Sequence, residues 1–86
     1  MTFTVIWSPS AENALARIWA DADDRQVITD AADAIDELLR TDPLAAGESR
    51  VANIRILTAL PLSVYYDVRE DDRLVSVWAV WRVSKR

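Results

Sequence analysis

Residues 61–83, PLSVYYDVREDDRLVSVWAVWRV, carry the clearest strand pattern in the chain. Apolar side chains alternate with more polar ones along the first half, as in a half-buried β-strand, at Leu62, Val64, Tyr66 and Val68. A charged turn at residues 70–72 follows, and residues 73–83 return as a second strand that is largely apolar on both faces. Such a strand is typical of the interior of a sheet. The stretch therefore predicts a β-hairpin at the centre of a small sheet.

The chain before this hairpin predicts one strand and two helices. Residues 3–7 are bulky or β-branched and stop at a Ser-Pro pair, which suits the start of a helix because proline lacks only an N–H that would be unpaired there. Apolar residues then recur at helical spacing over residues 9–22. An acidic pair at 23–24 can cap a second helix, which ends at Thr-Asp-Pro over residues 41–43. With so short a connection, the helices are expected to form an antiparallel hairpin.

Between the helices and the hairpin, residues 44–49 are expected to form a loop around Gly47, and residues 50–57 a further strand. The resulting order of elements is β-α-α-β-β-β. Helices gathered before a run of strands are typical of an α+β fold. We therefore expect a helical hairpin packed on one face of a small, mainly antiparallel sheet.

The hairpin leaves apolar side chains for the face of the sheet that the helices do not cover. Tyr65, Trp78 and Val80 have the parity of that open face, and exposed apolar patches usually mark interaction sites. Tyr66 has the opposite parity and is expected in the core. Trp78 and Trp81 also differ in parity, so one of them is expected in the core and the other at a protein interface.

The composition excludes several kinds of functional site. The 86 residues suffice for one domain over residues 1–86, and a domain of this size buries only about 60% of the surface that its unfolded chain exposes. The chain holds no cysteine and no histidine, which excludes disulfides, thiolate nucleophiles and histidine-based sites. We expect no cofactor and no metal, because the acidic residues 70–72 are typical of a solvated turn. No signal peptide or membrane-spanning run is visible, so we expect a cytoplasmic protein with no membrane partner.

Charge is distributed unevenly along the chain. The net charge is −4, but residues 1–49 have a net charge of −7 and residues 50–86 a net charge of +3. This asymmetry suggests two faces with two different partners. The alternative is that aspartate and glutamate simply solvate the helices.

Five motifs, in their order and spacing, resemble the RelE/ParE superfamily of toxins from bacterial type II toxin–antitoxin modules, which includes plasmid-stabilisation toxins. The motifs are VIWSPSAENALARI at 5–18, LLRTDPLAAGESR at 38–50, NIRIL at 53–57, VYYDV at 64–68 and VWAVWR at 77–82. The resemblance covers nearly the whole chain. It implies a compact toxin that a protein antitoxin neutralises by wrapping a flexible segment around it. The toxin is then expected to form either a homodimer or a heterotetramer with the antitoxin.

The resemblance implies one of two activities. RelE-like members cleave mRNA in the ribosomal A site, whereas ParE-like members poison DNA gyrase without cutting RNA. We expect the first, a ribosome-dependent mRNA interferase. The alternatives that stay open are a DNA gyrase inhibitor and a degenerate, non-toxic member that only binds a partner.

Cleavage of mRNA needs a base for the ribose 2′-OH, cations for the charge on the phosphate and an acid for the leaving oxygen. By resemblance, the catalytic candidates are Arg55, Arg82, Lys85 and Tyr65. The sequence departs from the family after Trp81, where Arg-Val-Ser-Lys-Arg stands in place of the histidine or tyrosine common in active members. The candidates for binding a partner are Trp78, Trp81 and Arg50.

Structural alternatives exist for these residues. Arg55 lies in an otherwise apolar strand, so its side chain is expected to face solvent or a partner, for a phosphate contact or for a surface ion pair. Arg50 can instead pair with Glu48 or Asp42. A tyrosine with an ordinary pKa of about 10 is a poor base at neutral pH unless cations lie beside it.

Overall fold

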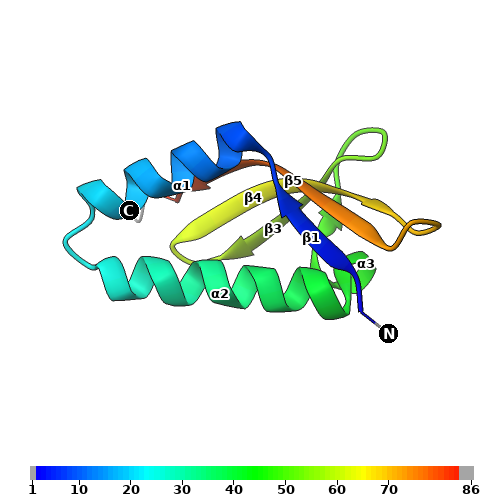
Figure 1. Cartoon of the computed structure of the whole chain (residues 1–86), viewed down its shortest axis with the longest axis horizontal. Helices are drawn as coiled ribbons and strands as arrows, with labels where there is room; N and C mark the ends of the chain where they lie inside the picture. The colour runs from blue at the N-terminus through cyan, green and yellow to red at the C-terminus, as the bar shows by residue number, and fades with distance from the viewer. Residues whose placement is uncertain (1, 84–86) are drawn as a thin grey trace.

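The computed structural model describes residues 2–83, which contain three helices and one five-stranded sheet (Figure 1). The elements are β1 Thr4–Trp7, α1 Pro9–Asp21, α2 Arg25–Thr41, α3 Pro43–Ala46, β2 Glu48–Ser49, β3 Arg55–Ala59, β4 Leu62–Arg69 and β5 Leu74–Arg82. The strand order is β1-β5-β4-β3-β2, with β1 parallel to β5 and the other neighbours antiparallel. The predicted α+β class and mainly antiparallel sheet are confirmed.

Helices α1 and α2 form the expected hairpin on one face of the sheet, joined by residues 22–24 (Figure 1). α1 begins where the sequence predicts: the Ser8 side chain accepts a hydrogen bond from the Ala11 N–H at 3.1 Å, and Pro9 is the first helical residue. This cap satisfies one of the N–H groups that the first turn leaves without a partner.

The core lies between the helices and the inward face of the sheet. Its buried residues include Ala11 of α1, Ile28, Ala31, Ile35 and Leu39 of α2, Leu57 of β3, Leu62, Val64 and Tyr66 of β4, and Val75, Val77 and Val80 of β5. Fully burying one such aliphatic side chain stabilises the fold by roughly 1.5–3 kcal/mol. The central hairpin β4–β5 thus supplies half of this set, as its alternating pattern indicates.

The segment between α2 and β3 differs from the prediction. α3 and β2 occupy most of the expected loop 44–49, and the strand expected over residues 50–57 begins only at Arg55. Residues 50–54 form a turn closed by two backbone hydrogen bonds of 2.8 Å, which leaves Val51 70% exposed. The reason is that the chain reverses here so that β2 can pair with β3, and alternation of side chains alone does not reveal a reversal.

Strand β5 contains a β-bulge at Trp78. Tyr65 of β4 lies opposite Ala79, and the next residue of β4, Tyr66, lies opposite Val77, so Trp78 is an extra residue on β5. Such an insertion leaves one residue unpaired and changes which face the following side chains occupy.

The bulge corrects two predictions about the open face. Val80, expected on that face, is 6% exposed and belongs to the core. Trp81, which was a candidate for the core, lies on the open face and contacts Tyr65. Both tryptophans of β5 therefore lie on the face opposite the helices. The inserted residue moves every later side chain of β5 to the other face from the one that simple alternation predicts.

Replacing Tyr66 by phenylalanine is expected to lower the free energy of unfolding by about 1–2 kcal/mol. The Tyr66 side chain is buried, and its hydroxyl donates a hydrogen bond of 2.7 Å to the Pro43 carbonyl at the start of α3. Urea unfolding measures the loss. Tyr65→Phe is the matched control, because Tyr65 lies exposed on the open face and its replacement is expected to change stability by less than about 0.5 kcal/mol. Equal losses in the two variants would contradict this role of the Tyr66 hydroxyl.

Candidate functional site

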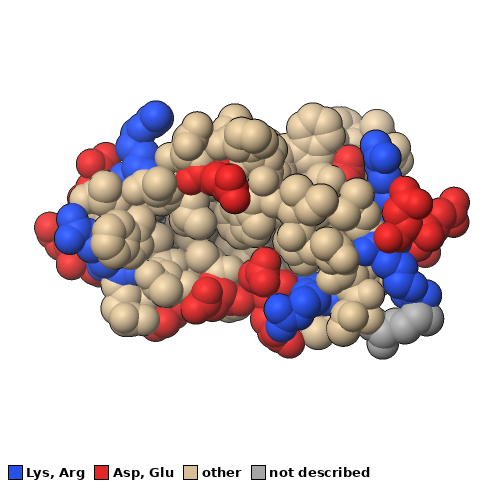
Figure 2. Space-filling model, in the orientation of Figure 1, with Lys and Arg blue, Asp and Glu red and all other residues tan. Residues whose placement is uncertain are grey.

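A groove of about 540 Å³ runs between α1 and α2. Apolar side chains form most of its surface, namely Trp7, Leu15, Ala16, Trp19, Ile28 and Ala32. Figure 2 shows the groove as a hollow in the middle of the helix face. The two alanines leave space between the helices, and Trp19 remains 44% exposed. An apolar groove between two helices suits the apolar face of a third segment.

Carboxylates border this groove. Glu12, Asp33 and Asp36 belong to its lining, and no lysine or arginine among residues 2–83 does. Acidic side chains lie on both sides of the hollow in Figure 2. The groove therefore complements a segment that combines an apolar face with basic flanking residues.

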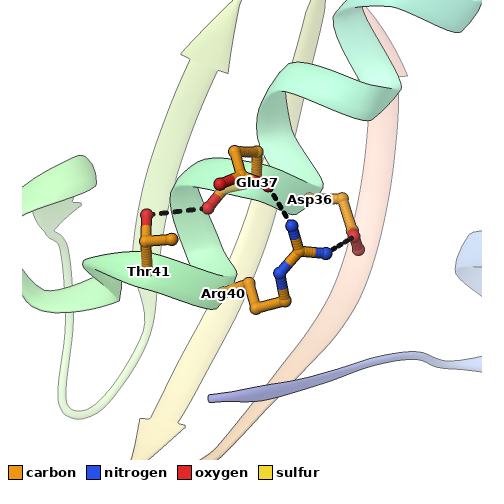
Figure 3. A network of polar contacts seen from close by, with 4 residues as sticks. All are labelled: Asp36, Glu37, Arg40 and Thr41. Carbon is orange, nitrogen blue, oxygen red and sulfur yellow. Dashed lines mark hydrogen bonds and ion pairs between the residues drawn. The ribbon is translucent and has the colours of Figure 1, made fainter. Parts of the chain in front are cut away.

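The end of α2 neutralises one of these three carboxylates. Arg40 lies 3.6 Å from Asp36 and also contacts Glu37, while the Thr41 hydroxyl donates a hydrogen bond of 2.8 Å to the Glu37 carbonyl (Figure 3). These exposed pairs within one helix each contribute only about 0.3–0.5 kcal/mol. Within residues 2–83, the other two carboxylates of the groove make no ion pair.

Arg55 stabilises the backbone of the segment before β3. Its guanidinium donates hydrogen bonds to the Leu44 carbonyl at 2.6 Å and to the Gly47 carbonyl at 2.8 Å. Its strand partner is the buried Tyr66, so the side chain starts on the helix face of the sheet. The expectation of a side chain that faces solvent or a partner is wrong, because the carbonyls at the end of α3 lie within reach of the guanidinium.

Arg82 joins the end of β5 to the connection between the helices. Its two guanidinium N–H groups donate to the two carboxylate oxygens of Asp24 at 3.0 and 2.9 Å. This hydrogen bonding lowers the pKa of the Asp24 carboxyl and raises the pKa of Arg82. Asp24, expected to cap α2, makes no capping hydrogen bond with its side chain. The reason is that its carboxylate is engaged by Arg82.

Replacing Arg82 by glutamine is expected to remove a small, pH-dependent part of the stability. A carboxyl whose pKa is lowered by folding stabilises the fold above its ordinary pKa of about 3.9 and loses that contribution as the pH falls through the lowered value. Arg82→Gln should therefore be less stable than the parent chain at pH 7, and the difference should vanish in acid. Urea unfolding at pH 7 and at about pH 2, well below the ordinary pKa of the carboxyl, tests this. Arg17→Gln, on the exposed side of α1, is the control, and a difference for Arg82→Gln that persists unchanged in acid would contradict the assignment.

The open face of the sheet holds the aromatic candidates. The rings of Tyr65 and Trp81 lie 4.8 Å apart at an angle of 53°, a geometry typical of attractive aromatic pairs. Trp78 is 53% exposed. Beside them, the hydroxyls of Thr58 and Ser63 share a hydrogen bond of 2.5 Å.

The remaining candidates are a surface arginine and the C-terminal lysine. Arg50 lies 3.9 Å from Glu48 in an exposed ion pair, which is the structural alternative that the sequence suggested. Lys85 lies outside the described residues.

The described residues do not bring the catalytic candidates together on one face. Tyr65 lies on the open face, whereas Arg55 and Arg82 extend from the helix face and are each held by hydrogen bonds. Within residues 2–83, no three side chains of metal-ligating type cluster, and no helix is long and apolar enough to span a membrane. What the arrangement offers is binding surface on two opposite faces.

The sequence did not reveal the groove. It depends on the distance between two helices, and periodicity within one helix carries no information on that distance. The one available signal was Trp19, a large side chain placed in the expected apolar stripe of α1 and followed by the acidic run that ends the helix.

Comparison with known proteins identifies the fold and the family. The toxin–antitoxin complex RelBE2 from Mycobacterium tuberculosis contains a chain that is similar in structure with a TM-score of 0.82 and 15% sequence identity, covering 99% of this chain and 95% of that chain. The chromosomal ParDE toxin–antitoxin system from P. aeruginosa contains another, with a TM-score of 0.75 and 20% identity, covering 95% and 97%. No curated protein matches the sequence. The family described as the ParE toxin of the type II toxin–antitoxin system, parDE, matches residues 5–86. The chain therefore belongs to the ParE toxin family, within the RelE/ParE superfamily.

Proposed function

We propose that this toxin acts by binding a protein target, DNA gyrase, and does not itself cleave RNA. The observation that carries the proposal is the engagement of its two candidate phosphate-binding arginines. RNA cleavage would need the positive charge of these two guanidinium groups at the phosphate. The Arg55 guanidinium is instead hydrogen-bonded to two carbonyls, and the Arg82 guanidinium is hydrogen-bonded to a carboxylate. An inhibitor that acts by binding requires no acid–base pair.

The chemistry of the side chains agrees with this proposal. The chain has no histidine, and Tyr65, the candidate base, lies on the opposite face from both arginines. A tyrosine without cations beside it is a poor base at neutral pH. The chain belongs to the ParE toxin family, and ParE-like toxins are the members of the superfamily that poison gyrase. Family membership therefore also favours gyrase as the target.

We further propose that the antitoxin binds in the groove between α1 and α2. An antitoxin is the expected partner of a type II toxin, and the groove offers apolar surface bordered by carboxylates. A helix or strand with an apolar face and basic flanks would bury Trp19 and pair with Glu12 and Asp33. Such charge complementarity raises the rate of association and selects the partner.

Inducible expression tests the proposed activity. The toxin is produced with and without its antitoxin, and growth, mRNA integrity and a DNA-damage reporter are followed together. We expect growth arrest with intact mRNA and an induced damage response, reversed by the antitoxin. Arg82→Gln should remain toxic, because this arginine serves the fold and not a reaction.

Three results would contradict the proposal. Cleavage of mRNA that disappears in Arg82→Gln would establish the alternative, a ribosome-dependent mRNA interferase. Arrest without a damage response would exclude gyrase as the target. Normal growth with abundant folded protein would indicate the degenerate, non-toxic alternative.

A further inference from the structure

The face of the sheet opposite the helices carries an exposed apolar patch. Ile6 is 49% exposed, Trp78 is 53% exposed and Tyr65 is 38% exposed. Ile6 of β1 lies opposite Ser76 of β5, and Trp78 occupies the bulge two residues further along β5. Trp78 therefore lies between β1 on one side and β4 on the other. We name the set Ile6, Tyr65, Trp78 and Trp81 the Trp78 patch.

The bulge at Trp78 is what creates this patch. Without the inserted residue, Trp81 would have the parity of Val77 and would point into the core, while Val80 would lie outside. With it, Trp81 lies outside and contacts Tyr65 at 4.8 Å between ring centres. Bulges are frequent at sheet edges and next to functional sites, where they change the direction of a side chain. The register of β5 thus exposes large aromatic surface where an uninterrupted strand would have buried part of it.

A carboxylate that has no ion-pair partner among residues 2–83 borders the Trp78 patch. Asp67 of β4 lies opposite Ser76 and so shares the open face. Its Oδ1 atom is buried and makes no hydrogen bond with the described residues, and no ion pair within residues 2–83 includes Asp67. A buried charged acceptor without a donor destabilises a fold, so we expect this oxygen to accept a hydrogen bond from water or from a bound partner. Asp67 as a residue is only half-buried, and its second carboxylate oxygen, Oδ2, is not a buried unpaired atom, so a partner can reach the carboxylate through Oδ2.

We propose that the Trp78 patch and Asp67 together bind a protein segment that presents an arginine or lysine between apolar side chains. The cation pairs with the Asp67 carboxylate, and its aliphatic stem lies along Trp78 and Ile6. An aromatic face attracts a cation and an apolar surface accepts the stem, so the site uses both parts of such a side chain. A hydrogen bond between charged groups is stronger than one between neutral groups, which favours arginine or lysine over glutamine.

The charges of this face select a basic protein segment over a nucleic acid. Single-stranded nucleic acids bind where aromatic side chains lie in a positively charged groove. Here the group beside the aromatic rings is the acidic Asp67, and the chain has a net charge of −4. Arg69, at the end of β4, is the one arginine that shares this face within β3, β4 and β5, and it lies two residues beyond Asp67.

The site is separate from the groove between α1 and α2, because the two lie on opposite faces of the sheet. A partner on the Trp78 patch and an antitoxin in the groove would not compete for the same residues. The inference therefore does not depend on gyrase being the target or on the antitoxin occupying the groove.

Titration of the isotope-labelled chain, followed by NMR, tests the proposal. The probes are acetyl-Leu-Arg-Leu-amide, the same peptide with glutamine in place of arginine, and a five-residue oligouridylate. We expect the arginine peptide to shift the indole N–H of Trp78 and the amide of Ile6. A partly exposed ion pair such as the one proposed with Asp67 contributes about 0.2–1 kcal/mol, so this peptide should bind up to about 5-fold more tightly than the glutamine peptide.

Variants separate binding from structure. Asp67→Asn should remove the preference for arginine and leave the chain at least as stable in urea, because an unpaired buried charge is lost. Trp78→Ala should abolish the shift at the amide of Ile6. Arg69→Gln is the control that should not weaken binding of the arginine peptide.

Several outcomes would overturn the proposal. They are the absence of shifts at Trp78, equal binding of the two peptides, an unchanged preference in Asp67→Asn, and a marked loss of stability in Asp67→Asn. Binding of the oligouridylate that depends on Arg69 and not on Asp67 would also overturn the proposal, because it would show that the patch binds a nucleic acid and not a basic protein segment.

Discussion

Replacing Gly47 by alanine is expected to lower the free energy of unfolding by about 3 kcal/mol, because the added methyl group would clash with two neighbouring groups. A Cβ atom at this position would lie closer than 3.0 Å to the Ile56 carbonyl and to the Tyr66 hydroxyl. Gly47 adopts an ordinary extended conformation, with φ at −122°, so the requirement for glycine comes from close packing and not from backbone freedom. The clash would separate β2 from β3 and weaken the bond from Tyr66 to Pro43.

Urea unfolding of Gly47→Ala measures this effect. Ser49→Ala, at the exposed second residue of β2, is the control and should change stability by less than about 0.5 kcal/mol. The double variant Gly47→Ala/Tyr66→Phe should lose less than the sum of the two single losses, because removing the hydroxyl relieves part of the clash. Additive losses, or a Gly47→Ala variant as stable as the parent chain, would show that the segment before β3 adjusts freely.

Replacing Ala16 by arginine is expected to weaken antitoxin binding by at least about 100-fold, or about 2.7 kcal/mol. Ala16 is exposed on α1 and lines the groove, so a long side chain there would fill the space proposed for the antitoxin. The added positive charge would also oppose a basic partner. Calorimetric titration of the toxin with its antitoxin measures the change.

Ala34→Arg is the matched control for this variant. Ala34 is also exposed on a helix but does not belong to the lining of the groove. The two variants add the same charge, so they differ only in position. An equal, small effect of both on antitoxin affinity would place the antitoxin elsewhere on the toxin.

The fold could be predicted from the sequence wherever one element carried its own signal. The alternation of Leu62, Val64 and Tyr66 identified β4, and the pair Ser8-Pro9 located the start of α1. Helical periodicity placed both long helices within a few residues of their bounds. The order of the motifs identified the superfamily, because it reflects the order of helices and strands that members of the superfamily share.

What the sequence did not disclose depends on contacts between distant segments. The bulge at Trp78 is visible only in the pairing of β5 with β4, since nothing within residues 74–82 marks an inserted residue. The ion pair of Arg82 with Asp24 joins residues 58 positions apart. Both features decide which candidate side chains are available to a partner, so the candidate site was less predictable than the fold.

Arg55 illustrates the same limit at shorter range. An arginine in an apolar strand suggests an exposed or ligand-binding side chain, and the expectation rested on reading residues 50–57 as one strand. The actual turn at residues 50–54 brings the end of α3 close to β3, where the carbonyls of Leu44 and Gly47 accept the guanidinium. The role of a side chain near a chain reversal can therefore be predicted only after the reversal itself has been located.

The most direct test of the proposed binding mechanism uses the purified toxin in two parallel reactions. In one, DNA gyrase acts on relaxed plasmid; in the other, ribosomes translate a defined mRNA. We predict that the toxin stops supercoiling and accumulates gyrase-linked DNA breaks, that the antitoxin reverses both effects, and that the mRNA stays intact on the ribosome. Cleavage of the mRNA with gyrase unaffected would contradict the account.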